Sequence, residues 1–384
     1  MDTTRYAPLI VNSKLARDLH GIQTASIRDE AARQKLGALL QSALQLEFAT
    51  IPTYLSAAFS LTGNSEIYEL ILRTAIEEML HFTAVANLMN AIGIAPDIVA
   101  AVPQYPCKLD VIDPPLTLDL RSFSFDLIEK LFMAVEAPER HVEFPTVAMV
   151  EAPPRTIGQF YAGIIDIIKQ DKIPGLFENA ARDAYKQREA KPNFHEIAYV
   201  NDQDSSKYPL KQEINFKITD KDTAAAHLRW VVSEGEGEAP YNPLDAEGLP
   251  GHHYRFQSIL KSRYLVPNKN VELKYSFSGG SLPFDQSGVH EFDRNAKAGD
   301  YQAFPAVAAQ MKAFNEKYSK MINLLHSAFN CPSPAQQDGA VAAYQDALRI
   351  MRSIGNAASL IVQEADNNHI KAGVPFEYAG PDIA

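Results

Sequence analysis

The sequence contains few cysteines, fewer basic than acidic residues, and no long apolar run. Its two cysteines, Cys107 and Cys331, both stand next to proline in expected loops, and two cysteines cannot form a disulfide framework. Lysine and arginine number 36 against 47 aspartates and glutamates, for a formal net charge of -11. This balance argues against nucleic acid or an anionic membrane surface as the main partner, because both bind basic surfaces.

Signals for membrane insertion or secretion are also lacking. No apolar run is long enough to span a bilayer. The N-terminal residues lack the basic start, apolar stretch and cleavage site of a secretory signal. We therefore expect a cytoplasmic protein that is not associated with a membrane.

What the sequence does contain is four long segments with helical periodicity. A composition of 46% hydrophobic and 22% charged residues is typical of a globular protein. The periodic segments lie near residues 30–61, 65–93, 304–329 and 336–363. We predict one mainly α domain over residues 1–384, in which these segments form a ferritin-like four-helix bundle. Residues 97–303 would then be a long irregular crossover insertion.

Ionisable residues lie on the apolar faces of the first two predicted helices. Glu78 and His81 share the apolar stripe of the second helix, because positions three and four apart lie on one face. Glu47 lies on the corresponding face of the first. A glutamate facing a Glu-x-x-His is half of a carboxylate-bridged metal site. The alternative is a buried hydrogen-bond or salt-bridge cluster with Arg73 or Tyr54 as partner.

The second half of such a site is missing from the two closing helices. Glu316 and His326 are too far apart in sequence to form a second Glu-x-x-His, and the last helix has none. The site is therefore mononuclear or is completed from the insertion. The insertion offers four candidates near a helix end and the next helix start: Glu234, Glu236, His252 and His253.

Among these candidates we predict Glu236 and His252 as metal ligands. Glycines on both sides of Glu236 allow a sharp turn that could aim its carboxylate. The loop between Glu236 and His252 would fold over the bundle and bring both side chains to the ion opposite Glu47. The alternative is a solvated, charged helix end. Carboxylate and imidazole ligands suit iron, manganese or zinc.

Several segments of the chain resemble a known family and keep its order. They are L-Q-L-E-F-A-T-I-P-T-Y-L, E-E-M-L-H-F, N-L-M-N-A-I-G, E-G-E-G, H-H-Y-R-F and A-G-V-P-F-E-Y. The chain resembles the ferritin-like family that includes the N-terminal part of iminophenyl-pyruvate dimer synthases of bisindole pathways, such as violacein and rebeccamycin. The resemblance implies a ferritin-like helical fold and a metal centre at five residues: Glu47, Glu78, His81, Glu236 and His252.

The chain departs from this family in two respects. The pathway synthases are much larger proteins, and this chain resembles only their ferritin-like part. Gln159 stands where similar sequences carry glutamate more often. If that glutamate contributes to the site, its absence predicts weaker charge compensation or a different metal.

These observations lead to a prediction of function. We expect a metal-dependent oxidoreductase, with one or two non-haem iron ions (manganese or zinc as alternatives), that uses dioxygen or peroxide. Its substrate would be a small amino-acid-derived or indolic molecule of secondary metabolism. Tyr54, Tyr161 and Arg255 are the candidate catalytic or substrate contacts. The alternatives are a non-catalytic metal-binding protein and a metal-free partner protein; a homo-oligomer is compatible with either.

Overall fold

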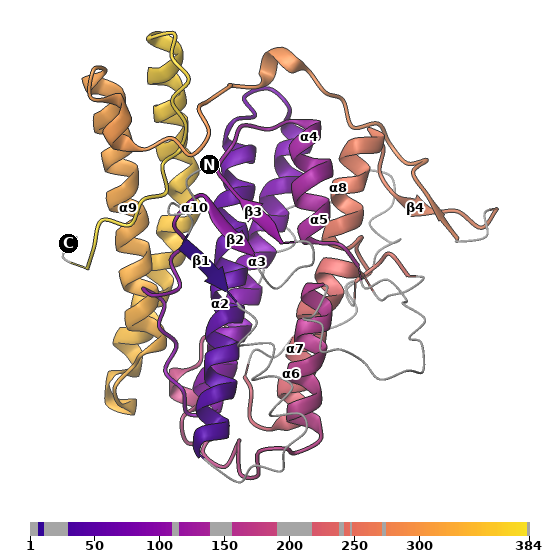
Figure 1. Ribbon diagram of the computed structural model, residues 1–384, viewed down its shortest axis with the longest axis vertical. Helices are drawn as coiled ribbons and strands as arrows, with labels where there is room; N and C mark the ends of the chain where they lie inside the picture. The colour runs from indigo at the N-terminus through magenta and orange to yellow at the C-terminus, as the bar shows by residue number, and fades with distance from the viewer. Residues whose placement is uncertain are drawn as a thin grey trace.

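The computed structural model is mainly helical, as the sequence predicts (Figure 1). It describes residues 7–10, 30–109, 115–138, 156–189, 217–237, 242–245, 248–270 and 274–381. The long helices are α2 (Glu30–Phe59), α3 (Ser65–Ala91), α9 (Pro305–Phe329) and α10 (Gln337–Asn367). Each begins within one residue of its predicted start.

Helices α2 and α3 form an antiparallel pair at the centre of the molecule. The short turn between them ends at Asn64, the N-cap residue of α3. Its side chain does not cap the helix; the Asn64 amide instead donates to the carbonyls of Asp285 and Gly288. The turn is therefore fixed by a distant loop, while α3 begins without a side-chain cap.

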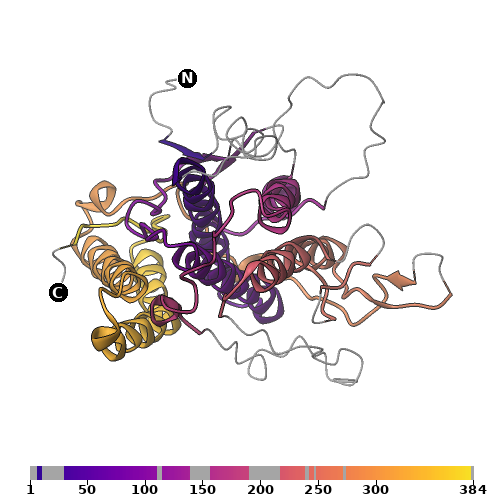
Figure 2. The ribbon, with the colours of Figure 1, turned by 90° about the horizontal axis from the view of Figure 1, so that it is seen from below.

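Two helical pairs cover opposite sides of α2 and α3, as Figure 2 shows. On one side, α9 and α10 pack through aromatic residues: Phe48 contacts Tyr318, and Phe82 contacts Phe329. On the other side lie α6 (Ile157–Lys169) and α7 (Lys221–Glu236). The predicted helical fold is confirmed, and the four predicted segments form helices that pack as two pairs, α2 with α3 and α9 with α10. The helices that face the ionisable residues of α2 and α3 are α6 and α7, which belong to the insertion.

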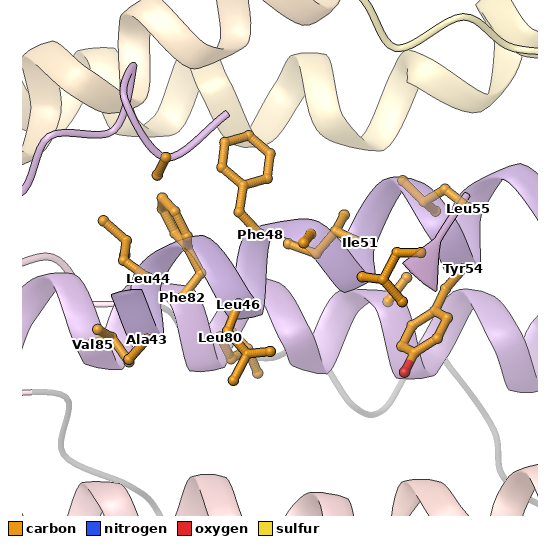
Figure 3. Packing of buried hydrophobic residues seen from close by; sticks show 14 of the residues in the cluster. Ala43, Leu44, Leu46, Phe48, Ile51, Tyr54, Leu55, Leu80, Phe82 and Val85 are labelled. Carbon is orange, nitrogen blue, oxygen red and sulfur yellow. The ribbon is translucent and has the colours of Figure 1, made fainter. Parts of the chain in front are cut away.

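The division between the two sides is visible in the core (Figure 3). Phe48 points toward α9 and α10, whereas the Tyr54 hydroxyl points the opposite way. Phe48, Phe82 and Tyr318 are nearly inaccessible to solvent. Burial of each large side chain of this kind stabilises the fold by roughly 1.5–3 kcal/mol. One face of α2 and α3 is therefore available for polar residues because the opposite face supplies the apolar packing.

The insertion contains short helices with clear N-terminal signals. Thr156 caps α6 in a capping box with Gln159. Asp220 caps α7 by accepting from the backbone of Asp222 and Thr223. The remaining helices in the described part of the insertion are α4 (Phe125–Leu127), the π-helix Ile128–Phe132, α5 (Met133–Val135), α8 (His252–Lys261) and the 3-10 helices Ala184–Lys186, Gln286–Gly288 and Ala298–Tyr301.

The strands are short and peripheral. Strand β2 (Cys107–Leu109) pairs with β1 (Ala7–Ile10) in parallel and with β3 (Leu116–Leu118) antiparallel. A second antiparallel pair is β4 (Val266–Pro267) with β5 (Tyr275–Ser276). Among the described helices, none is long and apolar enough to cross a membrane.

Candidate metal centre

Helices α2 and α3 place Glu47, Glu78 and His81 together in the interior. Each of the three side chains is less than one-tenth exposed. His81 Nδ1 lies 3.5 Å from Glu47 Oε2 and 3.6 Å from Glu78 Oε2. Thr50, one turn after Glu47, donates to Glu78 Oε2 at 3.2 Å. The predicted half-site therefore assembles from two adjacent helices, with helical periodicity setting its geometry.

A third carboxylate, Glu136, reaches the same place from the C-terminal end of α5. The preceding π-helix, Ile128–Phe132, is a form that often occurs at functional sites. Glu136 Oε2 lies 3.5 Å from His252 Nδ1. A Cβ built on Gly235 would meet Glu136 Oε2 at 3.1 Å, so this glycine allows the carboxylate to approach α7 closely. The sequence reasoning missed Glu136.

Glu234 near the end of α7 and His252 at the start of α8 complete the group. Glu234 Oε2 lies 3.2 Å from His81 Nε2. His252 Nδ1 lies 2.8 Å from Glu78 Oε1, and its ring stacks on that of His81 with centroids 5.5 Å apart. Both side chains are fully buried. The insertion thus supplies a glutamate and a histidine, but from two helices and not from a second Glu-x-x-His.

Two glycines bring the ends of the α7–α8 connection together. A Cβ on Gly251 would lie only 2.7 Å from the backbone nitrogen of Gly237. Gly237 has φ of +75°, a conformation that favours glycine. Its own Cβ would meet the Asn242 carbonyl at 2.7 Å. This close backbone contact places Glu234 and His252 side by side although a loop separates them in sequence.

Six side chains therefore offer ligand atoms in three overlapping groups. Within each group the atoms lie within 4.8 Å of one another. The groups are Glu47–Glu78–His81, Glu78–Glu136–His252 and His81–Glu234–His252. Four glutamates and two histidines are the ligand complement of a carboxylate-bridged dinuclear site in a helical bundle.

Burial and mutual interaction shift the pKa values of these groups strongly. Burial raises the pKa of Glu47 to about 7, with Glu78 contributing in the same direction. Burial opposes ionisation of Glu78, but His81 and His252 outweigh it and hold its pKa below the usual range. Burial disfavours the charged imidazole of His81, yet Glu78, Glu234 and Glu47 raise its pKa. The cluster therefore stabilises positive charge at its centre.

Charge and hydrogen bonding both fit a metal. Six buried carboxylates surround the site with two buried arginines, so four formal negative charges would be neutralised by two divalent ions. Among the described residues, Glu234 Oε1 makes no hydrogen bond, and His252 Nδ1 has only carboxylate oxygens near it, those of Glu78 at 2.8 Å and Glu136 at 3.5 Å. A buried polar atom without a partner is costly, whereas a metal ligand needs such a free lone pair. The carboxylates are Glu47, Glu77, Glu78, Glu136, Glu234 and Asp245, and the arginines are Arg73 and Arg255.

The three predicted catalytic residues are all fully buried beside the ligands. Tyr161 donates its hydroxyl hydrogen to Glu47, and Tyr54 donates to Glu136. Arg255 does not contact a ligand glutamate directly; it pairs with Glu77. The tyrosines can therefore hold and transfer protons at the ligand carboxylates.

A small cavity of about 30 Å³ opens beside the ligands. That is roughly twice the ~10–15 Å³ that one water molecule needs. Its apolar wall comprises Leu46, Val135, Ile157, Val231 and Val232. As formed by the described residues, the cavity admits an ion, water or a diatomic molecule.

The other residues considered from the sequence lie in different surroundings. The side chain of Glu236 is outside the described residues, although its backbone ends α7. The His253 ring contacts the Met133 carbonyl at 3.2 Å, away from the ligands. The Gln159 side chain accepts from the Thr156 backbone as part of the α6 cap. Glu77, the residue before Glu78, is buried, and its Oε2 lies 3.0 Å from His252 Nε2.

Comparison with known proteins identifies the family. The family model described as Ferritin-like matches residues 40–261. The chain belongs to the ferritin-like family. The match contains all six ligand residues and ends with α8, before α9 and α10. None of the curated proteins compared with the chain matches it.

The ferritin-like fold is also that of a similar solved structure. It is a ferritin like protein from Caulobacter vibrioides, with a TM-score of 0.52 and 18% sequence identity. The alignment covers 97% of this chain and 100% of that chain. At this identity the likeness shows the fold alone.

Proposed function

We propose that this ferritin-like chain is an oxidoreductase that holds two divalent metal ions, with iron as the physiological metal. The observation that carries the proposal is the convergence of four buried glutamates and two buried histidines with four uncompensated formal charges. A purely structural hydrogen-bond cluster would have to hold protons on its buried histidines and on Glu47 to balance these charges, whereas two divalent ions balance them directly.

The donor set supports iron or manganese, with zinc as an alternative. All candidate ligand atoms in the described residues are carboxylate oxygens or imidazole nitrogens. Both cysteines are free and buried, and neither belongs to a ligand group of the described residues. In the proposed assignment Glu47, Glu78 and His81 would hold one ion. Glu136, Glu234 and His252 would hold the second, and Glu78 belongs to a ligand group on each side.

The residues around the ligands have distinct roles in the proposed reaction. A bound iron pair supplies redox chemistry with dioxygen or peroxide. Tyr161 holds a proton on its hydroxyl next to Glu47, and Tyr54 does the same next to Glu136. Burial, together with the nearby glutamates, raises the pKa of both tyrosines, so they remain protonated at neutral pH. Val231 and Val232 belong to the apolar wall that restricts water.

The size of the cavity bears on the substrate. Small-molecule sites usually enclose roughly 300–1,000 Å³, and this cavity measures about 30 Å³. An indole ring does not fit inside it. The resemblance to bisindole synthases supports an amino-acid-derived or indolic substrate, which would have to bind at the mouth of the cavity. The partly exposed residues Ile157 and Val232 line this mouth.

The small size of the cavity also favours a second candidate function. A reaction of the metal ions with dioxygen or peroxide alone needs no organic substrate in the cavity. Such a protein would remove peroxide or oxidise its own metal. The two candidates share the metal centre and the oxidant, and they differ in whether an organic molecule accelerates oxidant consumption.

Elemental analysis followed by oxidant consumption tests both functions. Protein purified without chelator should contain close to two equivalents of metal, and Glu78→Gln should contain almost none. Consumption of dioxygen or peroxide with a reductant should require the metal, and the exposed change Glu69→Gln should leave it unchanged. Tryptophan and indole serve as probes: acceleration supports the first function and no effect supports the second. Metal without consumption would show a non-catalytic protein, and absence of metal would refute both functions.

A further inference from the structure

A second and larger cavity lies where α4 begins, and none of the six metal-ligand residues lines it. It measures about 520 Å³, and small-molecule sites usually enclose roughly 300–1,000 Å³. Its walls come mainly from the start of α4 and from the segment between β5 and α9, which lie at the same end of the molecule in Figure 1. We call this cavity the Phe284 pocket. The proposed function makes no use of it.

Three phenylalanines form one side of the Phe284 pocket: Phe123, Phe125 and Phe284. The rings of Phe125 and Phe284 lie edge to face with centroids 4.8 Å apart, and the Phe123 ring lies 5.5 Å from each. Phe123 is buried and supports the other two, which are half-buried. Because aromatic pairs stabilise a complex beyond the area that they bury, this wall favours a ligand with a flat ring.

The charged residues of the Phe284 pocket carry both signs in equal number. Its cations are Arg294 and Lys371, and its carboxylates are Glu291 and Asp293. The formal charges of the lining residues therefore sum to zero. A dianion such as a phosphate ester would face two carboxylates, and a diamine would face two cations. A ligand that carries one charge of each sign matches the lining.

Arg294 is held in a fixed orientation by a buried carboxylate. Asp119 is fully buried and pairs with both Arg121 and Arg294. The contact with Asp119 uses Nη2 of Arg294, whose side chain is still 57% exposed. A guanidinium has five N–H donors in a planar fork, which suits a carboxylate through two parallel hydrogen bonds. Arg294 thus offers a carboxylate site whose orientation is set before the ligand binds.

The two carboxylates of the pocket differ in their availability. Asp293 Oδ2 accepts from the Tyr301 hydroxyl at 3.1 Å. Glu291 Oε2 lies 2.7 Å from Lys371 Nζ, and both of these side chains are more than half exposed. Exposed ion pairs of this kind contribute little, so Glu291 can turn to a ligand cation at small cost.

We infer that the Phe284 pocket is a second small-molecule site, which binds an aromatic α-amino acid as its zwitterion. The ring packs against Phe125 and Phe284, the carboxylate binds Arg294, and the ammonium group binds Glu291. The site lies apart from the metal ligands, so the inference goes beyond the proposed function and does not depend on it.

Calorimetric titration with four matched compounds tests the ligand class. L-Phenylalanine carries all three groups, 2-phenylethylamine lacks the carboxylate, 3-phenylpropanoate lacks the ammonium group, and L-alanine lacks the ring. We expect one phenylalanine to bind per chain and each analogue to bind at least ~10-fold more weakly, the usual size of a lost charged hydrogen bond or buried ring. No binding of phenylalanine up to its solubility limit, or equal binding of an analogue, would overturn the inference.

The change Arg294→Gln places the carboxylate. It should weaken phenylalanine binding at least ~10-fold and leave 2-phenylethylamine unchanged, because that compound has no carboxylate to lose. Asp119 keeps Arg121 as its partner in this variant. Arg352→Gln is the matched control, an exposed arginine on α10 that does not line the pocket. Equal weakening of both compounds by Arg294→Gln would overturn the assignment.

A second variant keeps the test decisive if Arg294→Gln does not fold. Glu291 is exposed, and Glu291→Gln should weaken phenylalanine while 3-phenylpropanoate binds as before; equal weakening of the two would overturn the assignment. The metal-site variant Glu78→Gln separates the two proposals, since it should bind phenylalanine like the parent. Binding that is lost in Glu78→Gln and kept in Arg294→Gln would place the ligand at the metal centre and overturn the inference. Absence of metal with normal phenylalanine binding would refute the proposed function alone.

Discussion

The two halves of the candidate metal centre are built in different ways. In one half, Glu47, Glu78 and His81 project from the middle of long helices, where the backbone is fixed by hydrogen bonds on both sides. In the other half, three ligand residues stand at or near helix ends joined by irregular chain: Glu136, Glu234 and His252.

This difference has a physical consequence for metal binding. A ligand in mid-helix keeps its place as long as the helix packs, and α2 and α3 are packed on both sides. A ligand at a helix end depends on caps, turns and close backbone contacts, each of which one substitution can remove. We therefore expect the half from α2 and α3 to be the more robust one and the half from the insertion to be set by its connections.

The largest effect is expected from Glu78, which the two halves share. Glu78 belongs to two of the three ligand groups. Replacement by glutamine keeps the shape but removes the bridging charge, so both ions should be lost. We expect the metal affinity to fall by more than ~100-fold at both sites, because even the replacement of a residue that only supports a ligand typically lowers metal affinity 10–100-fold. Elemental analysis and circular dichroism check metal loss and helix content; one ion retained at full affinity would show that the halves are independent.

The next effect separates the halves by their histidines. His81→Ala should remove most of the bound metal, because His81 contacts Glu47, Glu78 and Glu234. His252→Ala should leave one ion bound to the α2–α3 half. Co²⁺ titration of the two variants measures the difference, and unchanged helical content confirms that both remain folded. Equal loss in the two variants would contradict the proposed robustness of the α2–α3 half, and parental metal binding by His81→Ala would refute its role as a ligand.

A smaller effect is expected from the glycines that close the α7–α8 connection. Gly251→Ala places a Cβ 2.7 Å from the Gly237 backbone nitrogen. The backbone of one of the two segments must move to relieve this steric clash. Overpacking of this kind typically costs about 1–3 kcal/mol, and we expect the second ion to bind ~10-fold more weakly. Urea unfolding and Co²⁺ titration measure both. Gly299→Ala is the matched control, because nothing lies within 4 Å of its added Cβ. Unchanged metal binding in Gly251→Ala would show that this contact does not position His252.

The same contrast explains which parts could be predicted from the sequence. Apolar periodicity identified the four long helices, and their ionisable residues indicated the half-site of Glu47, Glu78 and His81. Periodicity did not show which helices face that half-site, because α6 and α7 lie far along the chain from α2 and the pairing is tertiary. The aromatic side of α2, with Phe48 against Tyr318, contacts α9, one of the helices that the pattern assigned to the bundle.

The insertion contained two signals that could have improved the ligand predictions. Glu234 follows Trp230 and Val231 by four and three residues, so it shares their buried helix face. Glu136 stands at a helix C-terminus, where a carboxylate is electrostatically unfavourable. Such a carboxylate is more readily explained by a nearby cation, although only the fold shows that it is buried.

The smallest effect is expected at Gln159, where the chain departs from the sequences it resembles. The resemblance suggested that loss of a glutamate here weakens the site or changes its metal. In the structure the Gln159 side chain lies in the α6 capping box with Thr156.

Gln159→Glu therefore leaves the cap intact, because glutamate serves equally well at this position. A negative charge in the first turn of a helix is stabilising by typically 0.3–1 kcal/mol. We expect the free energy of unfolding, measured with urea, to rise by that amount. The metal stoichiometry should be unchanged, and the Co²⁺ affinity should stay within about 3-fold of the parent, which corresponds to less than ~1 kcal/mol. The parent protein is the control, because glutamine and glutamate have nearly the same shape and differ in charge. A third ion, or a second site strengthened 10-fold or more, would mean that α6 also supplies a ligand. The insertion would then contribute to the centre from a helix interior, as α2 and α3 do.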